Sequence, residues 1–124
     1  MNNCKHSLKR IEFEHVQILS TLDNLSNVNL PLNIRINTCE SLLHYVSEHF
    51  IDEEMLMNEY SDIYSVSYHK LQHEDLQETF LVNIAGFIKN DPKALSNMKS
   101  AFENHIQNID MPLFDIISQQ IEND

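Results

Sequence analysis

The sequence predicts an all-α protein, an up-down-up-down bundle of four helices. The 124 residues include one glycine and three prolines, too few turn-forming residues for a β-sandwich or a β-barrel. Apolar residues recur in alternating steps of three and four along four stretches, which is the spacing of one buried helical face. Short polar segments separate the stretches, so neighbouring helices are expected to be antiparallel. The length is that of one domain, and we interpret residues 1–124 as a single domain.

The first helix is predicted over residues 7–25, and its apolar stripe contains a histidine where leucine or isoleucine is expected. Residues 26–32, rich in asparagine and with one proline, are predicted to form a loop. The stripe consists of Leu8, Ile11, His15, Ile18, Leu22 and Leu25.

The second helix is predicted over residues 33–60. A histidine and a glutamate, His49 and Glu53, replace apolar residues in its stripe, while Glu54 is expected to face water. Residues 61–65 are predicted to break the helical pattern. The stripe consists of Ile36, Cys39, Leu42 or Leu43, Val46, His49, Glu53, Leu56 or Met57, and Tyr60.

The third helix is predicted over residues 66–89, with two histidines four residues apart on its stripe. Asp91 can cap the next helix, with Pro92 at its first position. The stripe consists of Val66, His69, His73, Leu76, Phe80, Ile84 and Phe87.

The fourth helix follows, and Asp110 comes five residues after its histidine, His105. Pro112 can kink or restart the helix before an apolar C-terminal segment. The apolar residues of this region are Leu95, Met98, Phe102, Ile106, Ile109, Leu113, Phe114, Ile116 and Ile117.

The formal net charge is −11, and such a surface repels phosphate backbones and anionic lipid, so nucleic-acid and membrane partners are not expected. No apolar run approaches the length of a membrane span, and residues 1–6 lack the apolar region of a secretory signal. Two widely spaced cysteines, Cys4 and Cys39, are expected to be reduced, with Cys39 in the core. We expect a cytoplasmic protein.

Each predicted helix therefore carries potential metal ligands on its buried face. A single buried histidine is more often hydrogen-bonded to a carbonyl than bound to a metal. The same faces also carry two carboxylates and no lysine or arginine. Burial of each carboxylate costs several kcal/mol of folding free energy unless a cation compensates its charge. The sequence therefore predicts metal binding. The seven candidate ligands are His15, His49, Glu53, His69, His73, His105 and Asp110.

Seven ligands exceed one octahedral shell but suit two ions bridged by the two carboxylates. Five terminal imidazoles and a solvent bridge then leave one position open on one ion. Mixed imidazole and carboxylate ligation favours iron, with manganese or zinc also possible. Ferritin-like oxidases use a Glu-x-x-His motif on each of two helices, and here that spacing occurs only at Glu12 and His15, with Glu12 off the stripe. This nitrogen-rich set favours reversible binding over oxygen activation.

These motifs resemble the hemerythrin family, in particular bacterial single-domain hemerythrins, over nearly the whole chain. The resemblance implies two iron ions with an oxo or hydroxo bridge and reversible O2 binding, for oxygen storage, delivery or sensing. It implies that Glu53 and Asp110 bridge, and that Phe102 and Ile106 wall the O2 pocket. The matching motifs are His15, then His49-Phe50-x-x-Glu53-Glu54-x-x-Met57, His69-x-x-x-His73 and His105-Ile106-x-x-x-Asp110. By this resemblance, His69, His73 and His105 hold the saturated iron and His15 and His49 the open one.

The chain departs from the family pattern near the site. It has no tryptophan, and Ala101 stands where the family commonly has one. Phe102 replaces a leucine at the O2 pocket, and the tyrosine-proline before the His-x-x-x-His helix is missing. Two other functions use the same residues: a di-iron enzyme acting on peroxide or nitric oxide, and a metal-stabilised interaction module. Of the remaining residues, His44 is expected at the surface and Phe13 in the core.

Overall fold

The computed structural model describes the backbone of residues 2–27, 29–60 and 63–123 and the side chains of residues 8–27, 29–59 and 66–119. Within these residues the chain is helical and contains no strand, as predicted. The helices are α1 (Asn2–Leu25), α2 (Leu32–Tyr60), α3 (Ile63–Ile88), α4 (Ala94–His105), a π-helical turn η1 (Ile106–Asp110) and α5 (Met111–Asn123).

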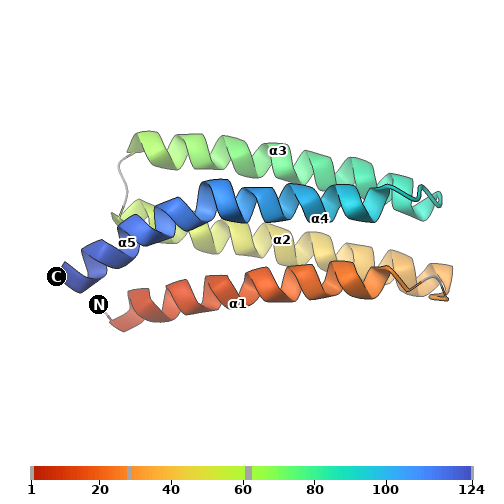
Figure 1. The fold of residues 1–124 in the computed structure, drawn as a ribbon, viewed down its shortest axis with the longest axis horizontal. Helices are drawn as coiled ribbons and strands as arrows, with labels where there is room; N and C mark the ends of the chain where they lie inside the picture. The colour runs from red at the N-terminus through yellow and green to blue at the C-terminus, as the bar shows by residue number, and fades with distance from the viewer. Residues whose placement is uncertain (1, 28, 61–62, 124) are drawn as a thin grey trace.

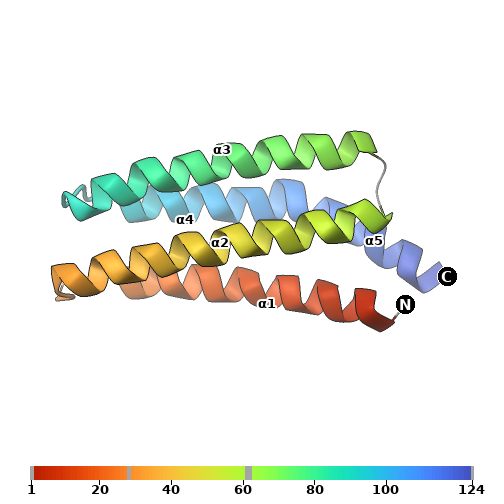
Figure 2. The ribbon, with the colours of Figure 1, turned by 180° about the vertical axis from the view of Figure 1, so that it is seen from behind.

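Four helices pack against one another in an up-down-up-down bundle, which confirms the predicted fold class (Figure 1, Figure 2). α2 contacts both α1 and α3, and α4 contacts both α3 and α1, so the four helices enclose one common interior. α5 continues α4 beyond the π turn and bends toward the first part of α1 (Figure 1). No helix in the described part of the chain has the length and apolar character to cross a membrane.

The interior consists of two apolar clusters with a polar layer between them. The larger cluster lies toward the α1–α2 and α3–α4 connections and includes Ile18, Leu42, Phe80 and Phe102. The smaller cluster lies at the other end of the bundle and consists of Leu8, Ile11, Leu56, Phe114 and Ile117. Along each helix the candidate ligands fall between residues of these clusters or beside them, so the polar layer is shielded from water on both sides.

Several helix limits differ from the prediction. α1 begins at Asn2 rather than near residue 7, and α3 already includes residues 63–65, which were predicted to break the helix, while residues 61 and 62 lie outside the described residues. Asp91 caps a turn rather than the helix itself: its Oδ1 accepts a hydrogen bond from Lys93 N at 3.0 Å, and α4 begins at Ala94. A helix continues for as long as its backbone hydrogen bonds are satisfied, and the apolar stripe marks only the part that packs against the core.

One predicted core residue is at the surface. Phe13, which was predicted to lie in the core, is 59 % exposed. Phe13 lies two residues after Ile11 and two before His15, both of which are buried. A displacement of two residues is more than half a helical turn, so Phe13 points away from the interior. The stripe residues Cys39, Phe80 and Phe87 are buried, in agreement with the prediction, and Phe50, which lies beside the stripe of α2, is buried as well.

Candidate metal centre

The structure brings all seven predicted ligands together in the polar layer. They come from α1, α2, α3, α4 and η1, and every one of them is buried. Their approach depends on the helical repeat, because His49 and Glu53 on α2, and likewise His69 and His73 on α3, lie one turn apart on the inward face. A buried cluster of His, Glu and Asp side chains that could hold a metal ion is therefore present.

The two oxygens of Glu53 face different histidines. Oε1 lies 3.2 Å from His15 Nε2 and 2.6 Å from His49 Nε2. Oε2 lies 3.4 Å from His69 Nε2 and 2.9 Å from His73 Nε2. One carboxylate thus reaches a pair of imidazoles from α1 and α2 through one oxygen and a pair from α3 through the other.

Asp110 divides its contacts in the same way. Its Oδ2 lies 3.2 Å from His15 Nε2, whereas its Oδ1 lies 2.8 Å from His69 Nε2 and 3.1 Å from His105 Nε2. The ligand atoms accordingly form two overlapping groups, in each of which all atoms lie within 4.8 Å of one another. Both groups contain Glu53 and Asp110; the first adds His15 and His49, and the second adds His69, His73 and His105.

Hydrogen bonding alone does not satisfy this cluster. The Nε2 atoms of His49 and His105 are buried without a hydrogen-bond partner, although each lies close to a carboxylate oxygen. A buried polar atom left without a partner costs on the order of 1–3 kcal/mol. Five imidazole nitrogens that converge with carboxylate oxygens form the donor set that proteins offer to transition metals. A bound metal ion would therefore satisfy these nitrogen and oxygen atoms better than their hydrogen bonds to one another do.

The π turn explains how His105 and Asp110 both reach the centre. In a regular α-helix, residues five apart are separated by about 140° around the axis, so the two side chains would point in different directions. In η1 the Met111 N–H donates to the carbonyl of Ile106, five residues earlier, and this wider turn brings Asp110 around to the side of His105. Pro112 follows directly and lacks the N–H of a regular α-helical bond. The expected kink at Pro112 thus begins one turn earlier, as a π turn.

Two further carboxylates hold histidines of the cluster from outside. His49 Nδ1 donates to Glu14 Oε1 at 3.0 Å, and His73 Nδ1 donates to Glu54 Oε2 at 2.9 Å. In the neutral imidazole, the form that binds a metal, these bonds fix the tautomer in which the Nε2 lone pair faces the centre, a common arrangement in metal sites. The expectation that Glu54 faces water is therefore wrong, because its side chain is only 25 % exposed and is bonded to His73.

Sequence reasoning missed these outer contacts, and also the stacking of Phe50 on His73, whose ring centroids are 3.9 Å apart. The signal was present: Glu14 and Glu54 each adjoin a predicted ligand in the sequence. A residue next to an inward-facing position lies about 100° around the helix. From there a glutamate can reach the outer nitrogen of a histidine on the neighbouring helix.

Within the cluster, the imidazoles and the carboxylates stabilise each other's charged forms. Burial alone disfavours the charged forms of His49, His69 and Glu53, but the contacts of these groups outweigh it. Burial lowers the pKa of His49, while contacts with Glu14 and Glu53 raise it to about 9. Burial also lowers the pKa of His69, while contacts with Asp110 and Glu53 raise it to about 9. Burial raises the pKa of Glu53, but the surrounding imidazoles hold it well below its ordinary value.

Of the two residues predicted to wall a ligand pocket, Phe102 lies against the histidines of α1 and α2. Phe102 is fully buried, with its ring centroid 5.8 Å from that of His15 and 6.1 Å from that of His49. Ile106 is half-buried and packs against the larger apolar cluster. His44, expected at the surface, is exposed, and its Nε2 lies 3.3 Å from Glu48 Oε1.

Comparison of the chain with profiles of known protein families, with curated proteins and with solved structures gave no match.

Replacement of Glu14 by glutamine is expected to weaken metal binding by about 10- to 100-fold, because the hydrogen bond that orients His49 becomes weaker. Metal affinity can be measured by competition with a chelator of known affinity. Glu12→Gln is the matched control, since Glu12 is exposed on the same helix. Equal affinities for the two variants would contradict an orienting role for Glu14.

The metal-free protein is expected to lose stability as the pH rises from about 6.5 through about 9. The imidazoles of His49 and His69 have pKa values near 9 in the fold against 6.5 in an unfolded chain. Their contribution is complete below the lower value and is lost as the pH passes the higher one. The carboxylates, with lowered pKa values, lose their contribution only at acidic pH.

Urea denaturation at pH values on both sides of this window measures the effect. His69→Gln should reduce the pH dependence, whereas His44→Gln, at an exposed position, should leave it unchanged. A free energy of unfolding that increases through the window would contradict the prediction.

Proposed function

We propose that the protein is a non-haem di-iron protein of the hemerythrin type that binds O2 reversibly at one iron. The observation that carries this proposal is the division of the two carboxylates. Each turns one oxygen toward the two-histidine group and the other toward the three-histidine group. Carboxylates that bridge two ions need this arrangement, and one central ion does not.

The unequal number of histidines supports a single ligand position. Three imidazoles with two bridging carboxylates and a solvent bridge complete one octahedral shell. Two imidazoles with the same bridges leave one position open on the other ion. This position would lie on the side of His15 and His49, where O2 would bind.

The residues around that side suit a small apolar ligand. Phe102 is fully buried and lies against both His15 and His49. An apolar wall excludes water and so disfavours the proton transfers that would assist oxidation of the centre. A reduced iron pair would supply the electrons that reversible O2 binding requires.

The composition of the ligand set supports binding rather than oxidative catalysis. Two carboxylates and five histidines make a set poorer in negative charge than that of the ferritin-like oxidases. Glu12, the other glutamate with the Glu-x-x-His spacing, is exposed and does not join the cluster. We therefore propose a binding protein for oxygen storage, delivery or sensing.

Exposure of the reduced, iron-loaded protein to O2 is expected to produce a visible charge-transfer absorption that disappears when O2 is removed. An optical titration in a sealed cell checks this, with Phe102→Leu as a variant of the pocket wall. Absorption that never returns to the reduced spectrum would contradict reversible binding. Steady consumption of peroxide or nitric oxide with a recycled reductant would instead indicate that the protein is a di-iron enzyme.

Metal analysis tests the bridging roles separately from O2. Glu53→Ala and Asp110→Ala are each expected to lose both irons, because each carboxylate serves both groups. His15→Ala should chiefly deplete the iron of the two-histidine group. The measurement is iron per chain, with helicity followed by circular dichroism. Two irons retained in Glu53→Ala would rule out the bridge.

A further inference from the structure

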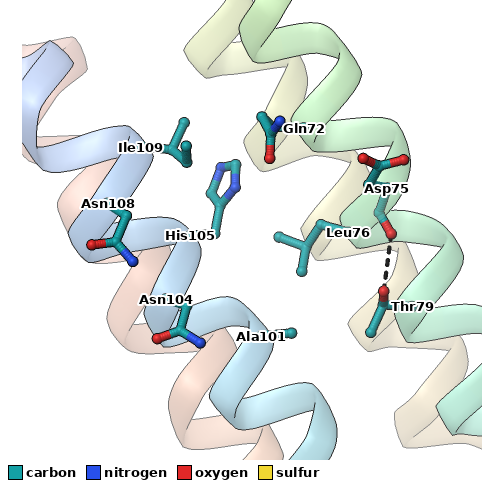
Figure 3. Close-up of a pocket in the computed structure, with 9 residues that line it drawn as sticks. All are labelled: Gln72, Asp75, Leu76, Thr79, Ala101, Asn104, His105, Asn108 and Ile109. Carbon is teal, nitrogen blue, oxygen red and sulfur yellow. Dashed lines mark hydrogen bonds between the residues drawn. The ribbon is translucent and has the colours of Figure 1, made fainter.

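A cleft between α3 and α4 leads from the surface to a ligand of the centre. It has a volume of about 280 Å³ and is shown in Figure 3. Gln72 and Asp75 border it from α3, and Ala101 and His105 border it from α4. In Figure 3 the side chains of Ala101 and His105 project from α4 toward α3, and those of Gln72 and Leu76 project from α3 toward α4.

The cleft ends at a residue that is otherwise covered. His105 is 6 % exposed, and its Nε2, which has no hydrogen-bond partner, lies 3.1 Å from Asp110 Oδ1. Ala101 lies one turn before His105 on the same face of α4. Because alanine is small, this position leaves the space beside the imidazole unfilled, where a larger side chain would close it.

The walls of the cleft suit a hydrated cation. No lysine or arginine borders it among the described residues, and the exposed carboxylate Asp75 lies at its outer part. A neighbouring hollow is bordered by Asp75 and a second exposed carboxylate, Glu78. Amide side chains of Gln72, Asn104 and Asn108 supply oxygens that can replace water around a divalent ion. The net charge of −11 also draws cations toward the surface.

A second hollow, of about 390 Å³, reaches His69 between α3 and the segment formed by η1 and α5. Its walls are formed mainly by Ile109, Pro112, Leu113 and Ile116. Apart from His69, only Tyr68 and Asn108 offer it a side-chain oxygen or nitrogen, and no carboxylate is among the described residues that border it. An ion that loses water there meets fewer side-chain oxygens than in the α3–α4 cleft and no carboxylate, so this hollow suits a cation less well.

We propose that the α3–α4 cleft is the port through which divalent iron reaches and leaves the centre. The proposal rests on the proposed di-iron function, because it assigns a route to the ions of that site. Asp75 attracts the ion, the amide oxygens accompany it as water is lost, and His105 is the first ligand of the centre that it meets.

The test is the release of Fe²⁺ from the reduced, iron-loaded protein. A bulky ferrous chelator in excess reports only iron that has left the protein, and release uses the route of uptake in reverse. Ala101→Trp fills the cleft and is expected to slow release by about tenfold or more. Ile116→Trp, which narrows the second hollow, is the matched control and should change the rate by less than about twofold.

A second pair of variants changes charge without filling space. Asp75→Lys places a cation at the outer part of the cleft and is expected to slow release about threefold at low salt and less at high salt. Glu40→Lys makes the same charge change at an exposed position on α2 and should leave the rate unchanged. Asp75 is exposed, so this pair tests the route even where Ala101→Trp alters folding.

The iron content of the unaltered protein distinguishes failure of the proposed port from failure of the proposed di-iron function. If the unaltered protein holds two irons and both Ala101→Trp and Asp75→Lys release iron at its rate, the port is wrong and the di-iron centre stands. Slower release in Ile116→Trp alone would assign the route to the second hollow and also overturn the port. If the unaltered protein binds fewer than two metal ions, the proposed function itself fails, and the port fails with it.

Discussion

Two carboxylates, Glu53 and Asp110, are fully buried in the middle of the bundle, and this constrains everything around them. A buried anion without a compensating cation costs several kcal/mol. No lysine or arginine contacts either carboxylate in the described part of the chain, where the surrounding groups are imidazoles. The cluster can therefore satisfy its charge in two ways, by protonation of histidines or by binding of metal ions. The unpartnered nitrogens of His49 and His105 favour the second.

The apolar clusters on either side make this constraint stronger. Phe102 and Ile18 on one side, and Ile11 and Phe114 on the other, keep water from the polar layer. Electrostatic interactions are stronger in such surroundings, so a metal ion contributes more to the fold than it would at the surface. The same packing holds the ligands in place, because each lies on a helix whose neighbouring residues are locked in a core. The outer carboxylates, such as Glu14, fix the remaining rotation of the imidazoles.

The two sides of the centre differ in their access to solvent. The two-histidine side is covered by Phe102, which suits a small apolar ligand. The three-histidine side adjoins both hollows, one at His105 and one at His69. Under the proposed function, the side that binds no external ligand is the one nearest to both openings. Such a division would let the protein exchange metal on one side while it keeps water from the other.

The sequence by itself determined the helices, the buried faces and the seven residues that converge, because the helical repeat alone decides which residues share a face. It also indicated the unusual spacing of His105 and Asp110. Only the tertiary structure decided the π turn that brings Asp110 inward, the division of the carboxylate oxygens, and the roles of Glu14 and Glu54. It also placed Phe13 at the surface. These features depend on how far each helix is rotated and which neighbour it meets, and a periodic pattern within one helix carries no information about its partner.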